Sequence, residues 1–278
     1  HFKTDYKDRD DTPADDLRGN TNYRDHSYMA RAQLQRFFND GDNIIIGSEI
    51  SLDQSRSNVL RNIYEQPEQR TSAGFAKYRM QLRDDLILDM GMRYDYRDVT
   101  GGEGYSIKSF QAFSPKISLI HDMNSSLITY LSYNKGFRAP SISELFLEYE
   151  SSYGLLLQGN PTLKPESLNS IESGFKLQKE GVSYFGNVFF NQYSDMIDFI
   201  YTIPVRSVNR KIVKGIGAEL GSNFYIDKTK SNFNFTYSYL NLNEGSDAPM
   251  LYRPKHKIRF TWVQQFSLLD FRLSTRYV

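Results

Sequence analysis

The sequence predicts an all-β fold, an antiparallel up-and-down transmembrane β-barrel, and three observations support this class. First, nearly every segment alternates apolar and polar residues, as a strand with two different faces does. Second, short polar turns and long excursions join these segments in alternation, which is typical of a barrel whose two ends meet different surroundings. Third, tyrosines gather near the strand ends, where membrane barrels carry aromatic girdles. Soluble sandwiches also alternate, and they are the structural alternative.

Three segments show the alternation most clearly. In residues 43–53, 86–97 and 269–277 most alternate positions carry aliphatic or aromatic side chains, and most of the positions between them carry charged or polar ones. The charged positions carry both signs, so this face is expected to meet water. Roughly twelve strands of this kind are predicted from near Asp25 to Val278.

The connections differ in length. Short turns are predicted at residues 39–42, 83–85, 122–125, 179–181 and 227–229, and long excursions at 56–71, 98–113, 139–169, 201–210 and 244–255. One helical turn is expected inside the third excursion. There Ser141 or Ser143 is suited to cap it, and Ile142, Leu145 and Phe146 would share one face.

Composition excludes several classes of protein. The 278 residues include 34 Lys and Arg against 33 Asp and Glu, so no global field would recruit nucleic acid. Only 39% of residues are hydrophobic while 14% are aromatic, which suits half-exposed strands better than a large globular core. No apolar run approaches the ~18 residues of a membrane helix. No leader peptide follows His1, so the chain is expected to begin inside a longer protein.

The sequence offers no recognisable catalytic or metal-binding set. There is no cysteine, and the four histidines are scattered without ligand spacing. An acidic run could hold calcium but lacks the glycine and final glutamate of an EF-hand, so a solvated loop is expected. No Ser/His/Asp or paired-carboxylate constellation argues for hydrolysis, so neither an enzyme nor a cofactor is predicted. The acidic run comprises Asp8, Asp10, Asp11, Asp15 and Asp16.

Two short sequence motifs, or boxes, at the ends of the third excursion resemble those of a known protein family. Phe137-Arg138-Ala139-Pro140 and residues 160–166, Asn-Pro-Thr-Leu-Lys-Pro-Glu, resemble paired boxes of TonB-dependent outer-membrane receptors. The segments around them resemble neighbouring hairpins of the same family from about Arg24 to Val278. The motif residues Phe137, Arg138, Pro140, Asn160 and Pro161 are expected to shape one extracellular loop.

The resemblance implies a barrel of about 22 strands around an N-terminal plug domain in the bacterial outer membrane. Residues 1–278 would form one partial barrel domain at roughly strands 8 to 19, with residues 1–7 ending strand 7. Neither the plug nor the closing C-terminal strands are recognisable in the sequence.

The resemblance also implies active import of a scarce ligand, either cobalamin-like, a siderophore or another metal chelate. The implied partners are the small-molecule ligand, the plug, the TonB energy-coupling complex and outer-membrane lipid, without nucleic acid. A passive porin, an outer-membrane enzyme, a soluble carbohydrate-binding protein, and uptake of a glycan or peptide by the same family are the alternatives. Haem is disfavoured because haem receptors carry a histidine between the two boxes, and residues 141–159 contain none.

Two groups of side chains are candidates for contact with the contents of the barrel. One group is expected to line the lumen and face the plug or the ligand: Glu49, Asp53, Asp89, Arg93, Asp95, Glu219, Arg272 and Arg276. The other consists of aromatic and polar loop residues suited to a macrocycle or chelate: Tyr149, Tyr153, Gln158, Tyr201, Arg206, Tyr252 and Arg253.

Overall fold

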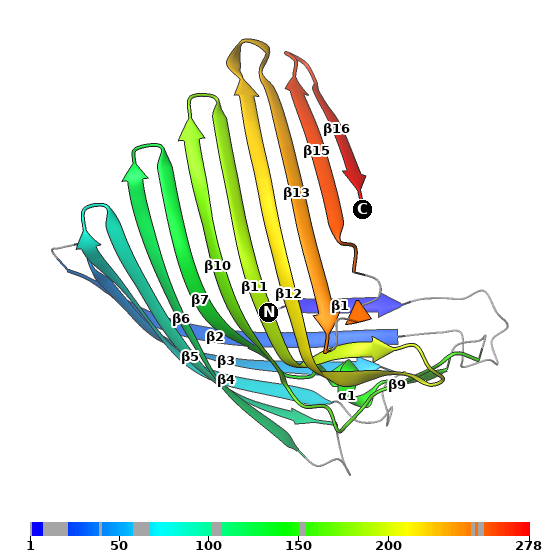
Figure 1. Ribbon diagram of the computed structural model, residues 1–278. Helices are drawn as coiled ribbons and strands as arrows, with labels where there is room; N and C mark the ends of the chain where they lie inside the picture. Colours follow the sequence, from blue (N-terminus) through cyan, green and yellow to red (C-terminus); the bar gives the residue numbers. More distant parts are fainter. Residues whose placement is uncertain are drawn as a thin grey trace.

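The computed structural model is a single curved antiparallel sheet (Figure 1). It describes residues 2–7, 22–38, 41–57, 67–101, 107–150, 154–245, 248–249 and 253–278. The main path follows chain order through these strands: β1 Phe2–Lys7, β2 Asn22–Phe37, β3 Asn43–Ser57, β4 Glu68–Arg83, β5 Leu86–Thr100, β6 Lys108–Asn124, β7 Leu127–Arg138, β10 Glu166–Lys179, β11 Val182–Ile200, β12 Val205–Ile226, β13 Ser231–Glu244, β15 His256–Gln265 and β16 Asp270–Tyr277.

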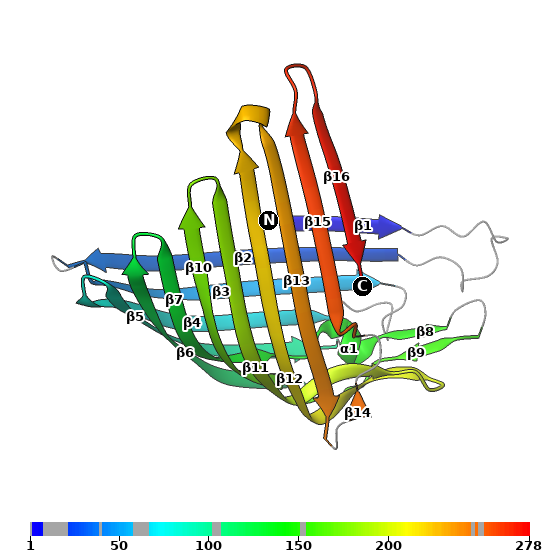
Figure 2. The ribbon, with the colours of Figure 1, turned by 45° about the horizontal axis from the view of Figure 1, so that its top comes forward.

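The predicted number of strands is confirmed. The sheet has 16 strands, of which the short β8, β9 and β14 lie off the main path. The other thirteen are β1 and, after it, the twelve strands predicted from near Asp25. Figures 1 and 2 show the sheet curling like part of a barrel wall, with hairpin turns at one end and long connections at the other.

The short turns fall where polar residues predicted them. Two residues link β4 to β5, β6 to β7 and β10 to β11, and a 3-10 turn, Asp227–Thr229, links β12 to β13. Gly181 and Lys230 have positive φ angles of 67° and 49°, which lets the chain reverse in so few residues. Residues 39–40 lie outside the described residues. A further turn between β15 and β16, at residues 266–269, was not among the predicted ones.

One predicted excursion is wrong, and others are shorter than predicted. Strand β11 runs to Ile200 and β12 starts at Val205, so only residues 201–204 connect them instead of 201–210. Ile200 pairs with Arg206 and Phe199 with Ser207, so the ladder continues through residues that the polar composition had placed in a loop. Strands β5, β6 and β10 likewise include residues that were predicted to lie in excursions: 98–100, 108–113 and 166–169.

The predicted helical turn is α1, Ile142–Phe146, in the excursion between β7 and β10. Ser141 is its N-cap, and Glu144 completes a capping box: the Glu144 N–H donates to Ser141 Oγ at 3.2 Å, and the Ser141 N–H donates to Glu144 Oε2 at 2.8 Å. Two short strands follow, β8 Glu148–Glu150 and β9 Leu156–Gln158, and β9 pairs parallel with β12. The remaining strand off the main path, β14 Ala248–Pro249, pairs with β13.

The largest buried apolar cluster lies beneath α1. The helix contributes Ile142, Leu145 and Phe146, of which Leu145 and Phe146 are almost fully buried. Val99 of β5 and Ile197 of β11 complete the cluster together with Leu163, and Phe110 packs against it. Strands far apart in the sheet therefore meet through the excursion, which fixes α1 against the inner side of the curve.

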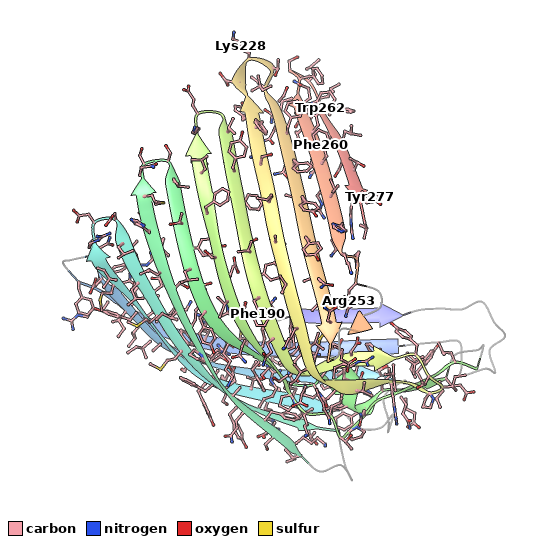
Figure 3. The ribbon with its side chains drawn as sticks, viewed as in Figure 1. Phe190, Lys228, Arg253, Phe260, Trp262 and Tyr277 are labelled. Atoms are coloured by element: carbon pink, nitrogen blue, oxygen red, sulfur yellow. The ribbon has the colours of Figure 1, made fainter. Side chains whose placement is uncertain are left out.

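The two faces of the sheet differ as the alternation predicted. Large apolar side chains such as Met92, Tyr94, Phe113 and Leu131 are about half exposed on the convex face. Aromatic rings gather near the turn end of the last strands: Trp262 stacks on Phe233 with ring centroids 5.9 Å apart (Figure 3). No helix among the described residues is long and apolar enough to span a membrane. The opposite, concave face carries the charged side chains.

Candidate functional site

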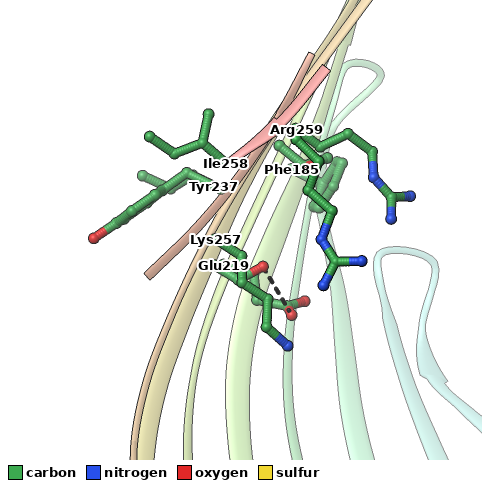
Figure 4. A pocket seen from close by; sticks show the side chains of 10 residues that line it. Phe185, Glu219, Tyr237, Lys257, Ile258 and Arg259 are labelled. Carbon is green, nitrogen blue, oxygen red and sulfur yellow. Dashed lines mark hydrogen bonds between the residues drawn. The ribbon is translucent and has the colours of Figure 1, made fainter. Parts of the chain in front are cut away.

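All eight predicted wall residues lie on the concave face. Because paired residues share a face, the strand register shows this directly: Glu49 pairs with Ala73 and Ala73 with Asp95, while Glu219 pairs with Ser238. Figure 4 shows the same division further along, with Lys257 and Arg259 on one side of the sheet and Tyr237 and Ile258 on the other.

Arg93 is the centre of a charge network on β3 and β5. Its guanidinium donates to Glu49 Oε1 at 2.9 Å and to Asp95 Oδ1 at 2.9 Å. Arg31 approaches the other oxygen of Glu49 at 3.8 Å and lies over the ring of Phe75. Asp95 is only 8% exposed, so its pairing with Arg93 offsets the cost of burying its charge.

The other acidic wall residues of this half also have donors. Asp53 accepts from Ser27 Oγ at 2.6 Å and from Gln69 Nε2 at 3.5 Å. Asp89 accepts two hydrogen bonds from Arg79, at 2.7 and 2.8 Å, in the bidentate geometry that arginine favours. Their carboxylates are therefore committed to neighbours on adjacent strands.

The C-terminal wall is less balanced. Glu219 accepts a long hydrogen bond of 3.4 Å from Ser238, whereas neither Arg272 nor Arg276 makes an ion pair within the described residues. A hollow of about 410 Å³ is lined by Glu219, Lys257, Arg259 and Arg276 (Figure 4). Its lining also includes Tyr237 and Ile258 from the opposite side of the sheet, so it is not a site confined to the concave face.

The loop candidates are only partly brought together. Gln158 of β9 lies beside Arg206 of β12 in the parallel pair, and Tyr149 of β8 lies opposite Leu157. Tyr201 is 71% exposed in the turn between β11 and β12. The guanidinium of Arg253 lies 3.9 Å from Asp198 of β11, which pairs with Val208 two residues beyond Arg206. Tyr153, Tyr252 and the acidic run of residues 8–16 lie outside the described residues.

Arg138 ties the two sequence boxes together. It donates through Nε and Nη2 to Glu166 at 2.8 and 3.2 Å, and through Nη1 to both oxygens of Glu144 at 3.0 and 2.9 Å. Glu166 also accepts from the backbone N–H of Ile197 at 2.8 Å. One arginine thus links the end of β7, the start of β10, α1 and β11.

The second box adds a tie to β12. Asn160 Nδ2 donates to the carbonyl of Ser207 at 3.0 Å, and the Asn160 backbone N–H donates to the carbonyl of Glu144 at 2.8 Å. Asn209 of β12 bonds both the N–H and the carbonyl of Lys164, at 2.9 Å each. We call the set Arg138, Glu144, Asn160, Glu166 and Asn209 the latch.

The remaining motif residues support the latch by packing. Pro140 is fully buried, Pro161 is half-buried in the turn, and Phe137 lies half-buried opposite Ser167 on the convex face. Pro140 donates no hydrogen bond, so it ends β7 without leaving a buried N–H unsatisfied. Gly159 lies so close to α1 that an added Cβ would stand 2.6 Å from the backbone nitrogen of Phe146.

Two arginines are absent from the predicted site residues. Arg210 joins Asp198 and Glu244 at 3.5 and 2.8 Å near the long-connection end, and it falls in the segment wrongly predicted as a loop. The alternation of residues 86–97 puts Arg97 on the same polar face as Asp89, Arg93 and Asp95, but the predicted set of wall residues does not include it. The described residues contain no group of three or more His, Asp or Glu arranged to hold a metal ion.

Taken together, the curved antiparallel sheet, its apolar convex face and its charged concave face define the wall of an outer-membrane β-barrel. A family profile described as TonB dependent receptor-like, beta-barrel matches residues 2–278. The chain therefore belongs to the TonB-dependent receptor family, as the two boxes indicated.

Known relatives are consistent with this assignment. The TonB-dependent heme receptor A of Haemophilus influenzae is 27% identical over 104 residues, 32% of this chain and 14% of its own length. The ferrienterobactin receptor of Escherichia coli is 25% identical over 132 residues, 42% of this chain and 16% of its own length. The chain thus spans a small part of these two curated relatives, both of which are named as receptors.

Solved structures share the fold. The copper transporter OprC superposes with a TM-score of 0.73 at 15% identity, covering 89% of this chain and 42% of its own. The hemophore receptor HasR of Serratia marcescens gives 0.70 at 16% identity, with 92% and 52% covered. The siderophore receptor PirA of Pseudomonas aeruginosa gives 0.66 at 15% identity, with 92% and 46% covered. The chain spans about half of each.

Proposed function

We propose that this chain is part of a receptor that imports a metal chelate across the outer membrane with energy from the TonB complex. The observation that carries the proposal is the charged concave face, which lies opposite the lipid-facing side of the sheet. Such a wall can solvate a plug domain and a polar ligand inside a barrel. The plug, the TonB complex and outer-membrane lipid would be the other partners.

The latch supports a receptor in preference to an open channel. It holds the excursion between β7 and β10 against β11 and β12, so side chains on that excursion have fixed positions at the long-connection end. Fixed loops can present a specific binding surface, whereas a passive pore needs only an open lumen. Gln158 and Arg206, adjacent in the β9–β12 pair, are the best placed of the predicted loop residues.

A siderophore or a similar chelate is the favoured ligand class. The matched relatives are named for heme, ferrienterobactin, copper and siderophores, all of them metals or metal complexes. Haem is disfavoured for this chain because residues 141–159 contain no histidine to ligate its iron. Cobalamin, a glycan or a peptide would be taken up by the same kind of receptor, and the experiment below includes them.

Growth rescue tests the proposal. The complete receptor that contains this segment would be expressed in a strain that lacks its own outer-membrane receptors, with iron or cobalamin limiting. Growth on one or more ferric chelates, lost when TonB is deleted, is expected. Growth that persists without TonB would indicate a passive channel. Rescue only by a glycan or a peptide would contradict the chelate assignment, and rescue only by cobalamin would contradict the preference for a ferric chelate.

A further inference from the structure

Arg97 lies on the concave face beneath the long excursion. In β5 it is two residues from Val99, a member of the cluster under α1. Across the sheet it pairs with Thr71 of β4 on one side and Phe110 of β6 on the other. The apolar neighbours partly shield its guanidinium from solvent.

The Arg97 guanidinium makes no hydrogen bond or ion pair with the described residues, and its Nε is buried. The charges of Asp95 and Asp53 attract it. Their recorded hydrogen bonds go elsewhere: Asp95 accepts from Arg93 at 2.9 Å, and Asp53 accepts from Ser27 at 2.6 Å. Arg97 is therefore a partly buried cation that two carboxylates attract without accepting a hydrogen bond from it.

Thr71, directly opposite, has the same deficiency. It is 5% exposed, and its Oγ1 is buried without a hydrogen-bond partner. A hydroxyl and a guanidinium side by side can both donate to one oxygen-bearing anion. A buried polar group without a hydrogen bond is costly, and here two of them lie opposite one another on adjacent strands.

We propose that Arg97 and Thr71 form a subsite for a carboxylate or similar oxyanion of the imported chelate. The inference rests on the proposed function and narrows it, because it assigns negative charge to part of the ligand. The planar fork of Arg97 would bind two oxygens, and the Thr71 hydroxyl would donate to one of them. Phe110 and Val99 exclude water from one side, which strengthens such hydrogen bonds.

The test compares two iron complexes with the complete receptor in detergent: ferric citrate, which carries carboxylates, and a neutral ferric trihydroxamate. Arg97→Gln is expected to weaken ferric citrate binding by about tenfold or more, and Thr71→Val by about threefold. Affinity for the neutral complex should stay within about twofold in both variants. Arg70→Gln is the matched control, because it removes the same charge from the convex face beside Thr71.

Each outcome decides the question. If wild-type receptor binds the trihydroxamate but not ferric citrate, or if Arg97→Gln weakens both complexes equally, the oxyanion subsite is wrong while chelate import stands. If Arg97→Gln lowers the melting temperature of the ligand-free receptor by several degrees and leaves ferric citrate binding unchanged, the partner of Arg97 is a carboxylate of the protein itself. That result also overturns the subsite. Binding of neither complex counts against the subsite, whereas the growth assay alone decides the proposed function.

Discussion

Arg138 and Arg97 lie in the same curved sheet but in opposite chemical situations. Arg138 makes four hydrogen bonds to Glu144 and Glu166, and these carboxylates are bonded in turn to the backbone of Ser141 and Ile197. Arg97 makes none among the described residues. A fully satisfied buried network rigidifies a structure, whereas an unsatisfied group marks a place where something else binds.

The difference separates two roles on one wall. The latch around Arg138 places the long excursion, and the apolar cluster under α1 seals it against β5 and β11. Beneath this cluster the Nε of Arg97 and the hydroxyl of Thr71 are buried and make no hydrogen bond. The excursion between β7 and β10 is thus held in a fixed position. Substitutions within it should lower the stability of the protein, whereas substitutions of Arg97 should weaken ligand binding.

The largest effect on stability is expected from Gly159→Ala. The added Cβ would stand 2.6 to 2.7 Å from backbone atoms of Leu145 and Phe146, and a helix backbone cannot move aside as a flexible side chain can. We expect a loss of about 3 kcal/mol and faster proteolysis within residues 139–165. Gly74→Ala is the control, because nothing lies within 4 Å of its added Cβ. Equal stability of the two variants would show that the excursion is not packed as described.

A smaller loss is expected from Glu166→Gln. The change removes one of the two charged acceptors of Arg138 and weakens the bond from the Ile197 N–H. Because the Arg138 side chain is 42% exposed, solvent compensates in part, and about 1 to 2 kcal/mol should be lost in chemical unfolding. Glu180→Gln, in the exposed turn before β11, removes the same charge and should change stability by less than about 0.5 kcal/mol.

Arg97→Gln should change the stability of the ligand-free receptor by less than about 1 kcal/mol, in either direction. Removing this partly buried cation relieves a desolvation cost and breaks no hydrogen bond, which offsets the lost attraction to Asp95 and Asp53. Arg138→Gln in the same unfolding assay should be clearly destabilising, because it removes the cation that pairs with both Glu144 and Glu166. If both variants lost a similar amount of stability, the two arginines would contribute alike to folding and this prediction would be wrong.

The smallest effect is expected at the turn end of the sheet, away from both arginines. The Tyr78 hydroxyl donates to Asp42 at 2.6 Å, and this bond, with a second from the Gln81 N–H, holds the pKa of Asp42 below its usual range. A lowered carboxyl pKa adds stability above the unfolded pKa that is lost as the pH falls through the folded value. Tyr78→Phe should move the pKa of Asp42 back upward in a carboxyl NMR titration, without affecting the latch.

Sequence periodicity predicted most of the fold. Alternation over residues 43–53 and 86–97 predicted β3 and β5 and the face on which each side chain lies, because successive side chains of a strand point to opposite faces. Polar turn residues located the hairpins, and a capping serine before the shared apolar face of Ile142, Leu145 and Phe146 indicated α1. The segment 201–210 failed because its pairing partners, such as Ile200 with Arg206, form across a tight turn that local composition does not reveal.

The candidate site was less predictable. Alternation alone put Glu49, Arg93 and Asp95 on one face, and the two boxes identified the family from their order and spacing. Which carboxylate each arginine would take could not be predicted, because Glu49 and Arg93 are 44 residues apart and meet only through the strand register. Gln158 and Arg206 likewise became neighbours only when β9 paired parallel with β12.

The sequence by itself therefore determined the class of the protein: the strands, their two faces, the turns and the motif residues Arg138 and Asn160, all of which depend on local spacing. Only the tertiary structure decided that Arg138 is satisfied and Arg97 is not. Pairing on a β-wall is settled by neighbours on adjacent strands, and in this chain those neighbours come from segments dozens of residues away.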